Sequence, residues 1–381
     1  MSFALEKTLS LILLIGIGIL LQSKFRSEDQ KKGIKTMILS LALPAMIFVA
    51  LMKIEINTDL LILPVLALSF NLVMWYITKI SLPTFGIRRN SKEMRTLSLL
   101  IPSLAPGLTC FPFIVEYLGD DLLAWAALAD IGNKIFVLIL AYLIAMSLYY
   151  KTQKLESRSN KEKVKELLIA MVSEPINLVI ILAIILLSFG LSMDSFPGFL
   201  STSIIMIKDI MTPLILLFMG IAVMFKWSQI RKIFSILTFR AGITFLLSGI
   251  FLWLAPELTP ALSLLAVVFP QSAVSFWPFA HMSAVRKMEL DSESLRKTFD
   301  LDLGINVLAV SMPFSTLVIL GIFTSGNLWI IPTNVLILGA SLVALSLSPQ
   351  LIKIIVANRK KLVVEKEERN HRNLKLEEME K

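Results

Sequence analysis

The sequence predicts an all-α polytopic membrane protein built from two inverted five-helix repeats and an additional C-terminal helix. Of its 381 residues, 56% are hydrophobic and only 17% are charged, and the mean hydropathy is +0.78. A water-soluble domain does not carry this composition. Two further observations support the prediction. The basic residues gather in alternate connections between apolar segments, and short proline and Asp-Gly-Asn patterns recur in the same order in the two halves.

Apolar segments of about 20 residues are long enough to cross a bilayer as helices. The N-terminal segment lacks a small-residue cleavage site and runs into a basic connection, so we interpret it as a retained helix. The last segment contains Pro332 and Pro349 and could instead be bent or partly interfacial. The eleven predicted segments span residues 4–22, 36–53, 59–81, 96–117, 122–150, 166–190, 202–225, 233–255, 258–284, 300–323 and 328–356.

Lys and Arg fall in every second connection, whereas "YLGDD", "LSMDSFPG" and "APELTP" carry almost none. The bias of basic loops toward the cytoplasm predicts an N-terminus outside and a cytoplasmic C-terminal tail. The net charge of +9 thus reflects topology, and we expect no nucleic-acid partner. The basic residues are Lys24, Arg26, Lys31, Lys32, Lys35, Arg88, Arg89, Lys92, Lys151, Lys154, Arg158, Lys161, Lys163, Lys226, Arg231, Lys232, Arg286, Lys287, Arg296, Lys297, Arg359, Lys360 and Lys361.

The longest connection, "KTQKLESRSNKEKVKE", divides the apolar part into two sets of five segments. Because each set has an odd number, the second must run with opposite orientation. We therefore predict a first repeat (1–150), a cytoplasmic linker (151–165), a second repeat (166–323), an eleventh helix (324–356) and a charged tail (357–381).

Three local patterns match between the two sets. "LALPAMIF" matches "IMTPLILLF", "LTCFPF" matches "SFWPF", and "DIGN" matches "DLGIN" with one residue inserted. Inverted repeats with interrupted helices are typical of secondary transporters. The matched residues are Pro44 with Pro213, Pro112 with Pro278, and Asp130, Gly132 and Asn133 with Asp302, Gly304 and Asn306.

Four stretches resemble the auxin efflux carrier family of bacterial permeases and plant auxin transporters. They are "SKFRSEDQKKGIKTMILSLALPAMIF", "ALADIGNKIFVLIL", "SEPINLVIILAIILL" and "VVFPQSAVSFWPFAHMSAVRKMELDSESLRKTFDLDLGINVLAVSMPF". The resemblance covers the first ten segments. It implies export or exchange of organic anions, a scaffold of segments 1, 2, 6 and 7, and a moving transport domain of segments 3 to 5 and 8 to 10. It also implies a homodimer, a bacterial inner (plasma) membrane location, and broken fourth and ninth helices that cross in mid-membrane.

The chain departs from the family pattern at the crossing. Family members commonly have an asparagine in the fourth helix where this chain has Ala105, and no asparagine lies near Val274 or Ser275 in the ninth. The resemblance therefore does not carry a particular substrate over to this chain.

Proline-broken helices are candidates for substrate binding, because a break frees backbone donors and acceptors that lipid cannot satisfy. The start of a half-helix carries partial positive charge and suits a carboxylate. The alternative is that the prolines are kinks absorbed by packing. The candidate substrate-binding residues are Pro106, Gly107, Thr109, Cys110, Pro112, Pro270, Gln271, Ser272 and Ser275.

Ionisable residues within the spans are candidates for coupling or charge compensation. Asp130 and Lys134 are four residues apart and share a helix face, next to Asn133. Lys134 could serve as counter-charge to an anion, held or released as Asp130 gains a proton, or the two could form a closed structural ion pair. Asp302 and Asn306 are the matched candidates, and for Asp302 a water-exposed helix cap is favoured.

Enzyme signatures are missing from the sequence. It contains no HExxH, Walker loop or GxSxG, and no Cys or His cluster that could hold a metal. We therefore expect neither an enzyme nor a cofactor, but a secondary active or facilitative transporter of small organic anions (carboxylates) that works by alternating access among membrane lipids. A Na⁺ or H⁺ gradient is the candidate driving force.

Two alternatives stay open. One is a sodium-coupled organic-anion symporter, with freed carbonyls and Asp130 or Asp302 holding the cation. The other is a membrane ligand sensor that uses a transporter fold and reports through its charged tail.

Overall fold

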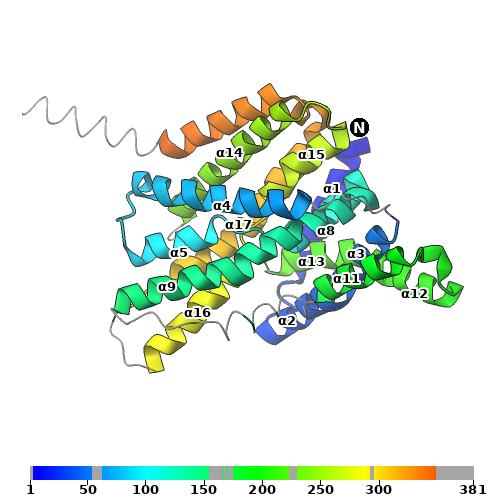
Figure 1. Ribbon diagram of the computed structural model, residues 1–381, viewed down its shortest axis with the longest axis horizontal. Helices are drawn as coiled ribbons and strands as arrows, with labels where there is room; N and C mark the ends of the chain where they lie inside the picture. Colours follow the sequence, from blue (N-terminus) through cyan, green and yellow to red (C-terminus); the bar gives the residue numbers. More distant parts are fainter. Residues whose placement is uncertain are drawn as a thin grey trace, which may run out of the picture.

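The computed structural model describes residues 3–53, 62–153, 165, 169, 175–222, 230–291 and 296–348. Every regular element in these ranges is a helix (Figure 1). This confirms the all-α part of the prediction. The predicted tail (357–381) and most of the predicted linker (151–165) lie outside the described residues.

Seven helices in the described ranges are long and apolar enough to cross a membrane, and three shorter apolar helices accompany them. Ten of the eleven predicted segments therefore contain an apolar helix, which is consistent with an integral membrane protein. The predicted segment 96–117 is instead divided into three short helices. The seven long helices are Asp29–Leu51, Ile62–Phe85, Asp120–Gln153, Gly198–Ala222, Arg231–Leu254, Pro260–Leu290 and Leu301–Trp329, and the shorter ones are Leu9–Leu21, Pro175–Ser188 and Pro332–Ser348.

The first half of the chain contains two helices that include a π-helical stretch and one that is interrupted. A π-helical turn frees a backbone carbonyl from its usual partner, and such turns are frequent at functional sites. The elements are α1 (Phe3–Leu21), α2 (Glu28–Met37), η1 (Ile38–Ala42), α3 (Leu43–Leu51), α4 (Ile62–Ser81), η3 (Leu82–Phe85), α5 (Lys92–Leu100), α6 (Pro106–Thr109), α7 (Phe111–Leu118), α8 (Asp120–Lys134), η4 (Ile135–Leu140) and α9 (Ala141–Gln153).

The second half of the chain also contains an interrupted helix among continuous ones. Its elements are α11 (Pro175–Ser188), η5 (Met193–Ser195), α12 (Gly198–Asp209), α13 (Met211–Ala222), α14 (Ile230–Leu254), α15 (Pro260–Val268), η7 (Phe269–Gln271), α16 (Phe276–Asp291), α17 (Leu301–Ser325), η8 (Gly326–Trp329) and the last described helix, Pro332–Ser348.

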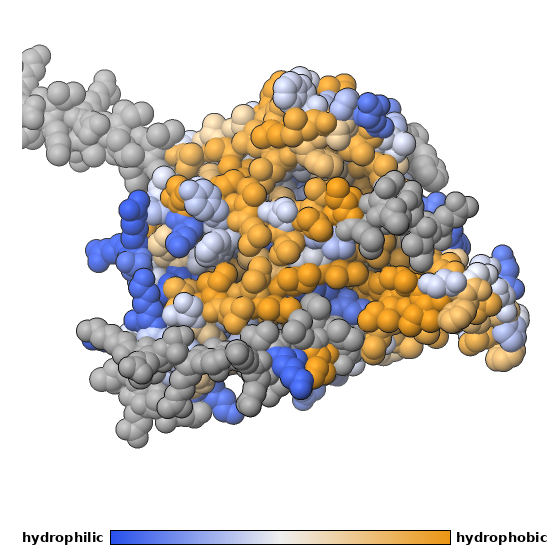
Figure 2. Space-filling view, in the orientation of Figure 1, coloured by the Kyte–Doolittle hydropathy of each residue, from blue (hydrophilic) through white to orange (hydrophobic). Residues whose placement is uncertain are grey.

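The side walls of the molecule are apolar. Figure 2 shows hydrophobic residues over the middle of the visible face and hydrophilic residues toward its two ends. Large hydrophobic side chains among the described residues are strongly exposed, such as Leu20 (78%), Phe199 (77%) and Trp253 (70%). An apolar surface of this extent is a liability in water but fits a lipid environment.

Glycines allow several helix backbones to touch. A Cβ on Gly132 of α8 would lie 1.8 Å from the carbonyl oxygen of Pro64 in α4. Gly18 of α1 and Gly220 of α13 approach each other's helix in the same way. Small residues at such contacts are typical of helix packing in membranes, where van der Waals contact replaces the hydrophobic drive.

The last described helix, Pro332–Ser348, packs along α14. A Cβ on Gly242 of α14 would lie 2.8 Å from the carbonyl oxygen of Gly339, and Ser235 donates a hydrogen bond to the carbonyl of Ser346 at 2.7 Å. This helix begins at Pro332, not at residue 328 as predicted. Proline suits the first helical position because its missing N–H would have no partner there, so Pro332 starts the helix and does not bend it.

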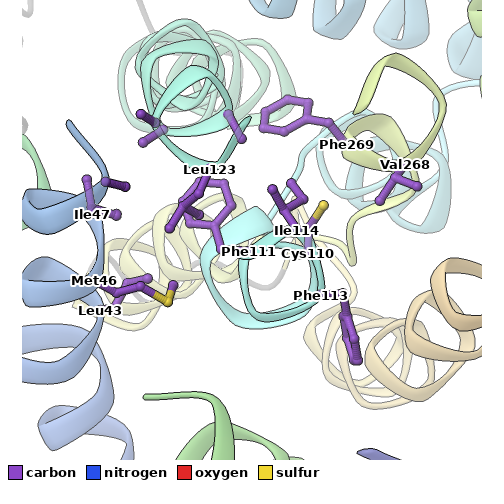
Figure 3. Packing of buried hydrophobic residues seen from close by; sticks show 14 of the residues in the cluster. Leu43, Met46, Ile47, Cys110, Phe111, Phe113, Ile114, Leu123, Val268 and Phe269 are labelled. Carbon is purple, nitrogen blue, oxygen red and sulfur yellow. The ribbon is translucent and has the colours of Figure 1, made fainter. Parts of the chain in front are cut away.

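The helix α7, which follows the interruption between α5 and α6, is held from several sides. Figure 3 shows Phe111 and Ile114 of α7 among side chains from α3, α8 and the α15–η7 segment, while Phe113 points away from these side chains. Phe111 and Phe113 are fully buried. Close packing of the first turn of α7 fixes this end of the helix, and with it the interruption that precedes it.

Candidate functional site

The two interrupted helices meet at their gaps. The first gap lies between α5 and α6, and the second between η7 and α16. The N–H of Ala105 donates to the carbonyl of Ala273 at 2.8 Å, and the N–H of Ala273 donates to the hydroxyl of Thr109 at 2.9 Å. The N–H of Ser275 donates to the hydroxyl of Ser103 at 3.0 Å. Backbone groups freed by one interruption are thus satisfied by the other.

Arg240, in the middle of α14, joins both gaps. Its Nε donates to the carbonyl of Ile101 at 2.8 Å, and its Nη2 donates to the carbonyls of Ser272 at 2.8 Å and Ser103 at 3.3 Å. The residue is 2% exposed. These carbonyls lie just beyond the C-terminal ends of α5 and η7, where helices carry partial negative charge, so the guanidinium is favourably placed.

Asn133 of α8 closes the first gap from a second side. Its amide accepts from the N–H of Leu104 at 3.2 Å and donates to the carbonyl of the same residue at 3.0 Å. It also donates to Asp130 at 2.8 Å and accepts from Asn71 of α4 at 2.8 Å. The side chain pairs with Leu104 as a neighbouring backbone would, so it replaces hydrogen bonds that the interruption removes.

Lys134 lies one residue further along α8 and connects it to α11. Its Nζ donates to Oδ1 of Asn177 at 2.9 Å and lies 3.7 Å from Oδ2 of Asp130. Both charged side chains are only 6% exposed. The contact to the amide is shorter than the contact to the carboxylate, so the geometry is looser than a closed ion pair. The π-helical η4 begins directly after Lys134.

The other predicted substrate-binding residues lie around the two gaps. Gly107 packs so closely on Leu43 that a Cβ would come within 2.9 Å of its Cδ2. Gln271 donates to the carbonyl of Ala241 at 3.2 Å, and the Ser272 hydroxyl donates to the carbonyl of Phe269 at 2.6 Å. Pro106 begins α6, Cys110 is buried between α6 and α7, Pro112 lies in the first turn of α7, and Pro270 lies in η7.

The matched residues on α17 are placed differently from those on α8. Asp302 lies in the first turn of α17 and is exposed, whereas Asp130 is buried. Asn306 is half-buried. The N-cap of α17 is Asp300, whose carboxylate accepts from the N–H of Leu303 at 3.1 Å. The position of Asp302 is that of a water-exposed residue at a helix start, which is the alternative that the sequence favours for it.

The buried polar side chains around the two gaps form what we call the polar centre. Three of its residues are absent from the sequence-based candidates: Arg240, Asn71 and Ser103. The first two carried a usable signal, because each is a single strongly polar residue within a long apolar segment. Ser103 carried none, because an isolated serine is ordinary in a membrane helix.

A separate pocket of about 290 Å³ lies where α7 meets α8. At its edge, Oδ2 of Asp120 accepts from Lys53 at 2.7 Å and from Lys208 at 3.1 Å. The carboxylate therefore ties the start of α8 to the ends of α3 and α12. The lining residues are Met46, Val115, Glu116, Gly119, Asp120, Lys208, Asp209 and Thr212.

Within the described ranges, no group of three or more His, Cys, Asp or Glu side chains could hold a metal ion. The described residues form an all-helical fold, and its seven long apolar helices are consistent with an integral membrane protein. Comparison of the chain with protein-family models and with curated protein sequences finds no match.

Proposed function

We propose that the chain is a secondary active or facilitative transporter of small organic anions (carboxylates), which bind where the two interrupted helices meet. The observation that carries this proposal is the charge buried there. Arg240 and Lys134 are basic and Asp130 is acidic, and each is no more than 5% exposed. The formal charge of this trio is +1. A buried excess of positive charge is costly in a membrane protein and favours an anionic ligand.

The proposed architecture is the auxin efflux carrier plan of two inverted repeats whose fourth and ninth helices cross. Its support is that both segments are interrupted, and that each gap supplies hydrogen-bonding partners for the other. The plan also places a homodimer contact on the scaffold helices α1, α2–α3, α11 and α12–α13.

Alternating access would move the remaining helices against this scaffold. The polar contacts across the proposed boundary include Lys134 of α8 with Asn177 of α11, and Asp120 of α8 with Lys53 and Lys208. Lys134 therefore lies both at the buried charge and at the surface that slides. A side chain in this place can sense an anion and pass the effect to the interface between the two groups of helices.

The test is flux of labelled malate, malonate and indole-3-acetate in proteoliposomes, with and without a sodium or proton gradient. We expect flux of at least one carboxylate in the wild type and its loss in Lys134→Ala. Lys151→Ala, which removes an exposed lysine further along the same helix, should keep wild-type flux.

Unchanged flux in folded Lys134→Ala would remove Lys134 from the site. Unchanged flux in the double variant Pro106→Ala with Pro270→Ala would remove the interruptions from it. Specific ligand binding without flux would favour a membrane sensor over a transporter.

A further inference from the structure

The gaps in the two interrupted helices create a cluster of backbone carbonyls. Ile101 and Ser103 follow the end of α5, and Ser272 follows η7. All three carbonyl oxygens accept from one side chain, so they face a single guanidinium group. Carbonyl oxygens at unwound helix ends are the ligands with which transporters commonly bind a coupling cation such as Na⁺. The interruptions therefore build a cation site from the backbone alone.

Arg240 fills this site. Its guanidinium is always protonated, and its planar fork of donors reaches the two gaps at once. The residue is 2% exposed. Within the described part of the chain, no carboxylate lies within 4.0 Å of the guanidinium. Carbonyl dipoles therefore stabilise this charge without cancelling it, as they would for a bound metal cation, and the net positive charge of the region remains.

We infer that the Arg240 guanidinium is a built-in cation that takes the carbonyl site of the two interruptions in place of an inorganic ion. The transport part of this inference rests on the proposed function: anion flux needs no sodium, because the position that sodium would occupy is permanently filled. The binding part does not rest on it: removing the side chain leaves a site for a small monovalent cation, of which guanidinium is the best match in shape.

The binding test uses thermal unfolding of the purified full chain in detergent. Arg240→Ala should unfold several degrees below the wild type, because three buried carbonyls lose their donor. Millimolar guanidinium chloride should recover much of this loss, because binding at the vacated site stabilises the folded state. Its denaturing effect is negligible at this concentration, because that effect grows in proportion to molar concentration. Choline chloride at the same ionic strength should not. In the wild type, where Arg240 occupies the site, the two salts should have the same effect on the unfolding temperature.

Two variants sharpen the test. Arg231→Ala removes an exposed arginine from the same helix and should show neither the loss nor the recovery. Arg240→Gln loses the charge but keeps a hydrogen-bonding side chain, and it replaces Arg240→Ala, with the same expected recovery, if that variant yields no folded protein. If guanidinium and choline had equal effects on the unfolding temperature of the variant used, the inference that Arg240 is a built-in cation would be overturned.

The flux part is separable from the binding part. Wild-type carboxylate flux should be the same in sodium and in choline buffers. A strict requirement for sodium would overturn the inference even where carboxylate transport is established. If no carboxylate is transported, the proposed function fails, while recovery of Arg240→Ala by guanidinium would still support the resident cation.

Discussion

At the scale of single residues, Asn133 makes more hydrogen bonds in the polar centre than its neighbours in α8 do. It makes two hydrogen bonds to the backbone of Leu104 and one each to Asp130 and Asn71. Asn133→Ala should lower the free energy of unfolding by about 1–3 kcal/mol, because it leaves buried backbone groups unpaired. Thermal unfolding in detergent measures the change. Asn334→Ala removes one hydrogen bond at an exposed helix start and should cost less. Equal losses in both variants would contradict this role.

The Asp130 and Lys134 pair allows the structural and functional interpretations to be separated. Lys134→Met alone leaves a buried carboxylate without its cation, which costs about 3–5 kcal/mol for a fully buried pair. Adding Asp130→Asn removes the unpaired charge and should recover most of the lost stability. We expect the double variant to be folded but inactive in carboxylate flux. Normal flux in the folded double variant would mean that the pair only holds α8 in place.

At the scale of helices, the prolines predict where the fourth and ninth segments are interrupted but not how the gaps are closed. Pro106 starts a half-helix, whereas Pro270 precedes its gap, so the same residue type marks opposite sides of an interruption. The closing contacts join residues far apart in the chain: Arg240 and Ile101 are separated by 139 positions. Local patterns report backbone preference, and they hold no information about such pairs.

Contact between α4 and α8 gives a prediction for a pair of helices. Gly132→Ala would place a Cβ 1.8 Å from the Pro64 carbonyl oxygen, so the two helices must separate. The free energy of unfolding should fall, and the adjacent Asn133 should be displaced from its hydrogen-bonding position. Gly33→Ala is the matched change in α2, where nothing lies within 4 Å, and it should be neutral or stabilising by up to about 1 kcal/mol because alanine favours helix. The unfolding temperatures of the two variants test this prediction. A Gly132→Ala variant that unfolds at the wild-type temperature would contradict the close contact.

At the scale of the whole molecule, apolar length and loop charge were enough to locate most of the helices. The exceptions have physical causes. The fourth segment is too interrupted to count as one span, and the eleventh begins at its proline, because proline is well tolerated at a helix start. The sequence predicts only some of the residues of the polar centre. The α8 residues were found because they are ionisable within a span, while Asp302, chosen by matching to Asp130, lies at an exposed helix start.

The ion pairs of Asp120 are expected to control access to the pocket at the α7–α8 junction. Asp120 is held by Lys53 and Lys208 from two helices of the proposed scaffold, so Asp120→Asn should favour separation of α8 from them. Partly exposed pairs are worth up to about 1 kcal/mol each, so loss of both pairs should raise the open population by up to about thirtyfold. Thr212→Cys, introduced into a Cys110→Ser background, reports this as faster labelling by a membrane-impermeant maleimide, because Thr212 lines the pocket. Asp194→Asn, an exposed acid in η5, should leave the rate unchanged. An unchanged labelling rate in Asp120→Asn would mean that this carboxylate does not hold the two groups of helices together. The proposed motion would then have to separate them at another place.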